Sequence, residues 1–196
     1  MNVGKVKRGL KSISNIFKTK NVITIKSTVS DFDLLNNKIV LITGGTGGIG
    51  KSIAIKMLEC GAKVIVCGTN QNKINSLVNK VNNNNFKGMI INLNEIDKFD
   101  NKIKEAKCQE KLFGKINVLV NCAGIHSTKN LMDYLSITED DYTKIMDTNL
   151  KGTYFISQSI AKYMISNKIK GHILNISSSF LEYTFLSSPF YYFLTI

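Results

Sequence analysis

Residues 42–52 read Ile-Thr-Gly-Gly-Thr-Gly-Gly-Ile-Gly-Lys-Ser, a glycine-rich turn that follows an apolar run and precedes a helical pattern. The apolar run at 39–43 predicts a buried strand, and the residues after Gly47 predict the first turn of a helix. The N-terminus of a helix carries free N–H groups and the positive end of the helix dipole, so it suits a phosphate group. This stretch therefore predicts a nucleotide-binding turn between a strand and a helix.

The turn fits three phosphate-binding templates, which are G-x-G-x-x-G, the P-loop G-x-x-x-x-G-K-S, and T-G-x-x-x-G-x-G. Gly45, Gly47 and Gly50 fit the first template. Gly45, Gly50, Lys51 and Ser52 fit the P-loop. Thr43, Gly44, Gly48 and Gly50 fit the third template. A P-loop protein needs a second strand that ends in Asp to hold Mg²⁺. None of the other predicted strands ends in Asp, so Lys51 and Ser52 are interpreted as the first turn of an ordinary helix.

Beyond the turn, segments that predict strands alternate with segments of helical spacing. Strands are predicted at 39–43, 63–67, 88–92, 116–121 and 172–176. The last helix is predicted to open at Thr138, with Asp141 three residues later in a capping-box pattern, and to carry Asn149 on its apolar face. The strands are apolar throughout, as expected where helices cover both faces of a sheet. The chain is predicted to be α/β, with a Rossmann-type doubly wound parallel sheet that binds its ligand beyond the carboxyl ends of the strands.

The charge is concentrated in a basic N-terminal extension, residues 1–37. The net charge is +12, and seven basic residues precede Asp31, the first acid. The rest of the chain has no basic stripe interleaved with aromatics, so we expect no nucleic-acid partner. The extension has apolar residues at helical spacing (Val3, Val6, Leu10, Ile13 and Phe17), which leaves a packed extension, organelle import and a membrane surface open.

Cysteine and histidine usage predicts no metal site. The 4 cysteines lie far apart, and there are 2 histidines. Widely spaced cysteines are typical of free thiols in a reducing compartment, which favours a cytoplasmic location. The chain also has no apolar stretch of the roughly 18 residues that a spanning helix needs, so no transmembrane span is predicted.

The residues after the second predicted strand bear on the choice of dinucleotide. An NAD-binding fold usually places an acid there to bind the ribose hydroxyls. No acid occurs between Glu59 and Glu95, and Gly68 is followed by Thr69, Asn70 and Lys73. A 2′-phosphate would therefore meet donors and no repulsion, which favours NADP(H) over NAD(H).

Five segments in order resemble the short-chain dehydrogenase/reductase family, from about residue 36 to residue 179. They are the T-G-x-x-x-G-x-G turn, Asn92-Leu93, Asn121-Cys122-Ala123-Gly124, Asn149 within Thr148–Gly152, and Asn175-Ile176-Ser177-Ser178. Two positions depart from the family pattern, since Asn92 stands in place of an acid and Cys122 in place of a second asparagine. The resemblance implies a Rossmann domain at 38–196 and an oxidoreductase that transfers hydride between nicotinamide and a carbonyl or alcohol carbon.

The resemblance also implies which residues act. The implied catalytic residues are Asn149, Ser178 and Tyr191. The implied cofactor-binding residues are Thr43, Gly44, Thr46, Gly48, Ile49, Gly50, Thr69, Asn92, Leu93, Asn121, Ala123 and Gly124. The family's tyrosine is followed four residues later by a lysine that lowers its pKa, whereas Thr195 stands four after Tyr191. Carrier-linked ketoacyl, sugar and other small carbonyl or alcohol substrates stay open, and members of the family are usually homo-oligomers.

The composition changes near the end of the sequence. No lysine follows Lys170, and seven of the aromatic residues fall within 180–196. Compared with the family, the helix with the Tyr-x-x-x-Lys pair and two further strands are missing, which makes the predicted domain incomplete. We therefore expect a truncated or frame-shifted reductase with impaired activity. The alternative is a non-catalytic nucleotide-binding protein that keeps the cofactor half of the fold.

Overall fold

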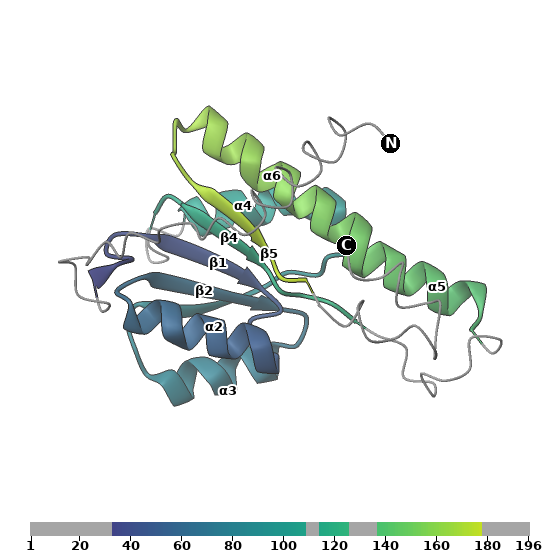
Figure 1. Ribbon diagram of the computed structural model, residues 1–196, viewed down its shortest axis with the longest axis horizontal. Helices are drawn as coiled ribbons and strands as arrows, with labels where there is room; N and C mark the ends of the chain where they lie inside the picture. The colour runs from purple at the N-terminus through teal and green to yellow at the C-terminus, as the bar shows by residue number, and fades with distance from the viewer. Residues whose placement is uncertain (1–32, 109–113, 126–136, 178–196) are drawn as a thin grey trace, which may run out of the picture. The chain divides into compact units, whose positions relative to one another are not determined.

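The structure is a computed structural model that describes residues 33–108, 114–125 and 137–177. Within these ranges strands and helices alternate along the chain (Figure 1). In chain order the elements are β1 (Ile39–Thr43), α2 (Gly48–Glu59), β2 (Lys63–Gly68), α3 (Gln71–Val81), β3 (Phe86–Ile90), the 3₁₀ turn η2 (Ile96–Lys98), α4 (Phe99–Cys108), β4 (Val118–Asn121), α5 (Glu139–Met146), the π-helical segment η5 (Asp147–Gly152), α6 (Thr153–Ser166) and β5 (His172–Asn175).

The strands of the described residues form one parallel sheet in the order β3-β2-β1-β4-β5. The register places Thr43 at the end of β1 between Cys67 of β2 and Asn121 of β4. This is the order of a doubly wound sheet. Successive strands are added in one direction from β1 to β3 and in the opposite direction from β4 to β5, which leaves a crevice at the carboxyl ends of β1 and β4. The predicted α/β fold and parallel sheet are therefore confirmed.

Helices cover both faces of the sheet, α2 and α3 on one side and α4 and α6 on the other (Figure 1). Successive residues of a strand point to opposite faces, so β1 contributes Ile39 and Leu41 to one core and Val40 and Ile42 to the other. Every residue of β1 and β4 is buried. Because both faces of these strands are covered, their sequences are apolar without alternation, as predicted.

The predicted strand boundaries shift where burial extends beyond the hydrogen-bonded ladder. The strand predicted at 88–92 lies at Phe86–Ile90, although Ile91 and Leu93 stay buried after it ends. The strand predicted at 116–121 begins at Val118, and Ile116 is buried ahead of it. The strand predicted at 172–176 ends at Asn175 and the one at 63–67 extends to Gly68. Apolar sequence marks burial, and strand ends are set by backbone pairing.

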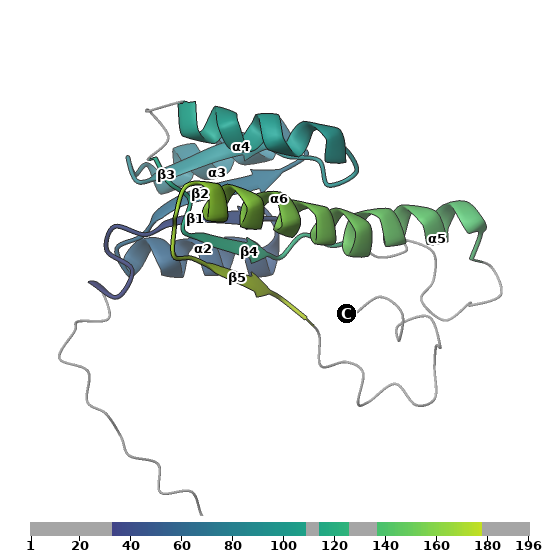
Figure 2. The ribbon, with the colours of Figure 1, turned by 90° about the horizontal axis from the view of Figure 1, so that it is seen from above.

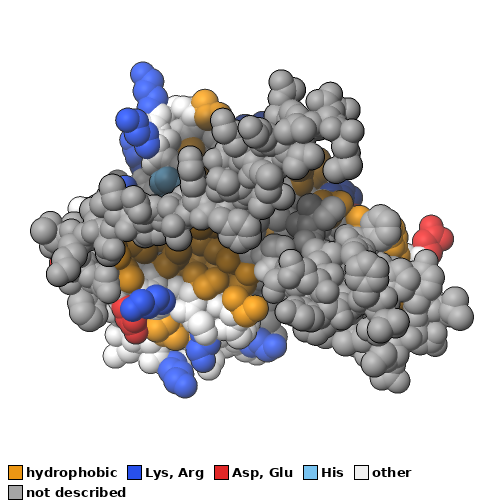
Figure 3. All heavy atoms as spheres, viewed as in Figure 1, with side chains coloured by type: hydrophobic (Ala, Val, Ile, Leu, Met, Phe, Trp, Pro, Cys, Tyr) orange, Lys and Arg blue, Asp and Glu red, His pale blue; other side chains and the backbone are white. Residues whose placement is uncertain are grey.

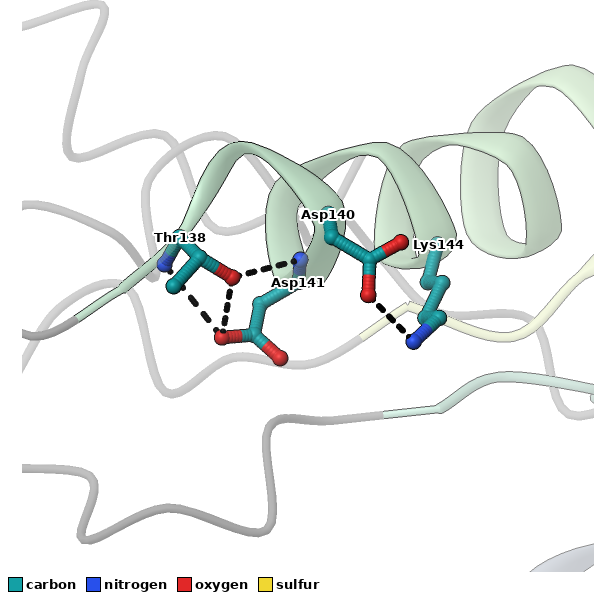
Figure 4. Close-up of polar contacts among 4 residues, drawn as sticks. All are labelled: Thr138, Asp140, Asp141 and Lys144. Atoms are coloured by element: carbon teal, nitrogen blue, oxygen red, sulfur yellow. Dashed lines mark hydrogen bonds and ion pairs between the residues drawn. The ribbon is translucent and has the colours of Figure 1, made fainter.

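The last helical stretch begins as predicted but is not a single α-helix. Thr138 accepts a hydrogen bond from the N–H of Asp141, whose carboxylate accepts from the backbone N–H of Thr138, which is the predicted capping box (Figure 4). Between α5 and α6 the chain forms the π-helical segment η5, which contains Asn149. Figure 2 shows α5 and α6 as one long rod joined through this segment. Within α5 Tyr142 is exposed and Ile145 is buried, and Ile156 and Ile160 of α6 are buried.

The edge strand β5 differs from the strands inside the sheet. All its residues are exposed, including the apolar Ile173 and Leu174. β5 pairs with β4 alone among the described strands. Figure 3 shows hydrophobic side chains gathered on the face of the molecule seen in Figure 1, next to the lysines. The cover expected on both faces of the strands therefore holds for β1 and β4 but not for β5.

Candidate functional site

The glycine turn is packed tightly against the loop that follows β4. Gly44 has a φ of +66°, which favours glycine, and a Cβ added there would lie 2.7 Å from the Cα of Ala123. A Cβ on Gly50 would lie 2.4 Å from the carbonyl oxygen of Gly44. The first turn of α2 therefore presses on the turn itself, and these two glycines are needed for backbone packing.

The N-terminus of α2 is open on its other side. A Cβ on Gly48 would have nothing within 4 Å, and Ile49 is 65% exposed. No side chain caps the helix at Gly47, and its first turn contains no acid. The first N–H groups of a helix lack partners within the helix, so a free and electropositive end faces this space. The residues present fit a dinucleotide pyrophosphate, which supplies the negative charge and the oxygen acceptors.

The P-loop interpretation finds no support in the position of Ser52. Its hydroxyl donates to the carbonyl oxygen of Gly48 at 3.0 Å, within the first turns of α2. Moreover, none of the described strands ends in Asp. Lys51 and Ser52 are thus ordinary residues of α2, as the sequence analysis predicts.

Thr43 lies beneath the turn and holds the β4 loop. Its side chain is 2% exposed, and its hydroxyl oxygen accepts from the N–H of Cys122 at 3.2 Å and of Ala123 at 3.3 Å. The cross-strand register brings Thr43 next to Asn121. The loop after β4 is therefore fixed to the glycine turn. Cys122 is half-buried here, and burial raises the pKa of its thiol.

Asn149 holds the same loop from the opposite side. Its Oδ1 accepts from the N–H of Ile125 at 2.8 Å, and its Nδ2 donates to the carbonyl oxygen of Ile125 at 2.8 Å. Gly124 lies against this amide, since a Cβ there would be 3.5 Å from the Asn149 Oδ1. The oxygen and the nitrogen of the Asn149 side chain thus each bind the backbone after β4, and the π segment η5 carries this residue.

The loop after β3 is joined to η5. Leu93 is 4% exposed, and a Cβ on Gly152 would lie 2.6 Å from the Leu93 Cβ. Asn92 accepts from the N–H of Asn94 at 3.1 Å, and Asn94 in turn accepts from the Thr148 hydroxyl at 3.0 Å. The contact between Thr148 and Asn94 was not foreseen from the sequence, because it joins residues more than fifty positions apart.

The end of β2 carries exposed polar side chains. Thr69, Asn70 and Lys73 are all exposed, and Asn70 caps α3 by accepting from the N–H of Lys73 at 2.9 Å. A Cβ on Gly68 would lie 3.3 Å from the Thr46 hydroxyl, so Thr46 reaches across from the glycine turn. The capping bond occupies the Asn70 oxygen and leaves its amide nitrogen as a donor.

A network of side-chain hydrogen bonds joins β4, β5 and α6. Asn121 is 4% exposed, and its Nδ2 donates to Ser157 Oγ and to Asn175 Oδ1, each at 2.8 Å. Asn121 is among the residues expected from the sequence, whereas Ser157 is not. A serine four residues after Thr153 in an apolar helix gives no local sign of a partner on another element.

Two implied residues, Ser178 and Tyr191, lie outside the described residues. Within the described ranges, no group of three or more His, Cys, Asp or Glu side chains could hold a metal ion. No helix in that part of the chain is long and apolar enough to cross a membrane. The remaining implied residues lie at or after the carboxyl ends of β1, β2, β3 and β4, at the first turn of α2 and at η5.

Comparison with known proteins identifies the class to which this site belongs. The family model described as short chain dehydrogenase matches residues 38–192. The chain belongs to the short chain dehydrogenase family of oxidoreductases.

The chain matches individual relatives over part of their length. The chain is 30% identical over 145 residues to an uncharacterized oxidoreductase of Staphylococcus aureus strain USA300, a match that covers 74% of this chain and 60% of that protein. It is 35% identical over 146 residues to a tropinone reductase homolog of Arabidopsis thaliana, covering 74% of this chain and 53% of that protein. The chain thus spans 60% or less of the length of these two relatives.

Solved structures share the fold. A gluconate 5-dehydrogenase from Burkholderia cenocepacia, solved in complex with NADP and tartrate, superposes with a TM-score of 0.72 at 26% identity. The match covers 84% of this chain and 63% of that one. A short-chain dehydrogenase/reductase from Brucella melitensis has a TM-score of 0.71 at 18% identity, which supports the fold alone.

Proposed function

We propose that this protein is an NAD(P)-dependent oxidoreductase that transfers hydride between a nicotinamide and the carbonyl or alcohol carbon of a small substrate. The observation that carries the proposal is the open N-terminus of α2, which follows a tightly packed glycine turn and faces the loop after β4. Family membership supports the reaction class. A bound dinucleotide supplies the hydride chemistry at its nicotinamide ring.

The residues around the turn would divide the binding of the cofactor. The N–H groups at Gly48, Ile49 and Gly50 would face the pyrophosphate, because they lie at the positive end of α2. Asn92 and Leu93 would border the adenine, next to the carboxyl end of β3. Ala123 and Gly124 would let the nicotinamide ribose approach the backbone after β4. Thr43, Gly44 and Asn121 would shape the site from below, through the contacts that hold the turn and the loop together.

The cofactor preference would be NADP(H) over NAD(H). At the end of β2 the exposed Thr69, Asn70 and Lys73 offer hydroxyl, amide and ammonium donors, and Thr46 lies beside Gly68. No carboxylate stands there to repel a 2′-phosphate. The gluconate 5-dehydrogenase noted above was solved with NADP, which agrees with this preference in a relative.

The proton chemistry would rest on three residues. Tyr191 would donate a proton to the carbonyl oxygen or remove one from the alcohol, and Ser178 would hold the substrate oxygen. Asn149 would fix the geometry between the π segment and the loop after β4, through its two hydrogen bonds to Ile125. General acid catalysis of this kind contributes about 10²–10⁴-fold to a rate.

The test uses the purified full chain. NADPH and NADH are titrated by fluorescence, and NADPH oxidation is followed with ketoacyl, sugar-derived and small ketone acceptors. We expect tighter binding of NADPH and acceptor-dependent oxidation that Tyr191→Phe abolishes and the matched Tyr192→Phe leaves in place. Failure to bind either dinucleotide would refute the proposal.

A second candidate function is non-catalytic nucleotide binding. It is favoured by Thr195, which stands where the family's lysine would lower the pKa of Tyr191. Saturable NADPH binding with no acceptor-dependent oxidation by the full chain would support this candidate over the first.

The proposed setting follows from the residues already named. The cysteines Cys60, Cys67 and Cys122 are free thiols, which suits a cytoplasmic protein. The proposed partner is a small carbonyl or alcohol substrate, with a homo-oligomeric assembly as in the parent family and no nucleic acid.

A further inference from the structure

The buried amide of Asn121 has a fixed orientation, and the cause lies on another element. Ser157 of α6 donates its single hydroxyl proton to the carbonyl oxygen of Thr153, at 2.7 Å. Its oxygen is then left as an acceptor, so the Asn121 side chain must present its nitrogen there, at 2.8 Å. A helix serine bonded back to the carbonyl four residues earlier thus acts here as an acceptor toward the sheet.

The orientation passes on to Asn175. With one Nδ2 proton on Ser157, Asn121 gives the other to Asn175 Oδ1 at 2.8 Å. The Asn175 amide must therefore turn its oxygen inward. The backbone reinforces this contact, because the N–H of Ile176 donates to the carbonyl oxygen of Asn121 at 2.9 Å. Ser157 therefore sets the polarity of two amides and fixes the carboxyl end of β5.

The carboxyl end of β5 depends on these hydrogen bonds to hold its position. β5 is an edge strand whose residues are all exposed, so few packing contacts hold it. Ser177 follows directly, and Ser178 comes next in the chain. This arrangement has an energetic cost, because the Asn121 Oδ1 is buried without a hydrogen-bond partner in the described structure.

We propose that Ser157 is a positioning residue for the reaction: its hydroxyl orients Asn121 and Asn175 and thereby holds the carboxyl end of β5, which Ser177 and Ser178 follow in the sequence. This proposal rests on the proposed function, because Ser178 is the residue assigned to the substrate oxygen. Ser157 itself acts through its neighbours.

The experiment compares Ser157→Ala, Ser157→Thr and Ser166→Ala in the ¹⁵N-labelled full chain. Thr keeps a hydroxyl that can bond to the same carbonyl. Ser166 is the matched control, because it lies on α6 and also donates to the carbonyl four residues earlier, that of Lys162, but is exposed. Hydrogen exchange is measured at the Ile176 amide and at the Asn121 side-chain amide, with the central β1 amide of Ile42 as the reference for global opening.

In Ser157→Ala we expect exchange at Ile176 to speed up on the order of tenfold relative to Ile42, and the Asn121 NH₂ signals to shift. Ser157→Thr should restore both to within about twofold, and Ser166→Ala should change neither. Equal exchange in Ser157→Ala and wild type, or failure of Thr to restore it, would overturn the proposal.

The exchange comparison also separates this proposal from the proposed function. NADPH titration of the wild-type sample tests the function separately, because it asks only whether the unaltered chain binds a dinucleotide. A wild-type chain that binds no dinucleotide would refute the proposed function, while the exchange data would still decide whether Ser157 holds the end of β5.

Discussion

Replacing Gly48 or Gly50 by alanine should separate cofactor binding from folding. Both residues lie in the first turn of α2, two positions apart, but their surroundings differ. A Cβ on Gly48 meets nothing within 4 Å, whereas a Cβ on Gly50 would lie 2.4 Å from the Gly44 carbonyl oxygen and 2.9 Å from its carbon. The same substitution therefore has opposite consequences for the free energy of unfolding.

The expected magnitudes follow from these contacts. Gly48→Ala should be neutral or stabilising by up to about 0.5–1 kcal/mol, because alanine loses less backbone entropy in a helix. Gly50→Ala should cost about 1–3 kcal/mol or more, because the atom it meets is backbone and cannot rotate away. If the open space before α2 receives the pyrophosphate, the Gly48→Ala methyl group should weaken NADPH binding by about tenfold, or about 1.4 kcal/mol.

Urea unfolding measures the changes in the free energy of unfolding, and NADPH fluorescence titration measures the change in the dissociation constant. Ser52→Ala is the control, because it removes a hydroxyl that a P-loop would need and that this fold uses within α2. It should leave the NADPH dissociation constant unchanged. The reasoning would be refuted if Gly48→Ala bound NADPH like wild type, or if Gly50→Ala were as stable as wild type.

Three further predictions concern other parts of the site. Lys73→Glu should weaken NADPH binding by roughly fivefold with little effect on NADH, and Lys80→Glu on the same helix should affect neither, as fluorescence titration can show. Asn149→Ala should lower the free energy of unfolding by about 1–3 kcal/mol in urea, because both hydrogen bonds to Ile125 are lost; equal stability would contradict their importance. Burial raises the pKa of the Cys67 thiol in the folded chain, so the unfolded chain loses this proton first and stability should fall as the pH rises above about 9. The Cys67 thiol should lower the free energy of unfolding by about 1.4 kcal/mol per pH unit in this range. In Cys67→Ala this contribution to the pH dependence should be absent, whatever the absolute stability of that variant.

The central strand and the last helix start could be predicted because their determinants are local. The run 39–43 is apolar at every position, and β1 occupies exactly these residues. The Thr138 and Asp141 side chains satisfy each other's backbone within one turn, so the sequence spacing was enough to predict the capping box. β3 was placed two residues late, because its hydrogen bonds to β2 begin at Phe86 and that pairing has no local pattern.

The π segment shows a limit of helical spacing. The sequence from Thr138 onward predicts one amphipathic helix, and Asn149 was expected on its apolar face. The chain instead widens over Asp147–Gly152, where Gly152 packs against Leu93 and Asn149 pairs with the backbone of Ile125. These partners come from two loops distant in sequence, so no period within the helix could indicate them.

The sequence by itself determined the α/β class, the parallel sheet, the glycine turn and the family, because each depends on residue patterns within a few positions of the chain. Tertiary structure alone decided which glycine of the turn is open and which is packed, since Gly48 and Gly50 differ in what the folded backbone brings near them. It also decided that Ser157 orients Asn121 and Asn175. Hydrogen-bond direction depends on where every proton of a network goes, and this network exists only once α6, β4 and β5 have come together.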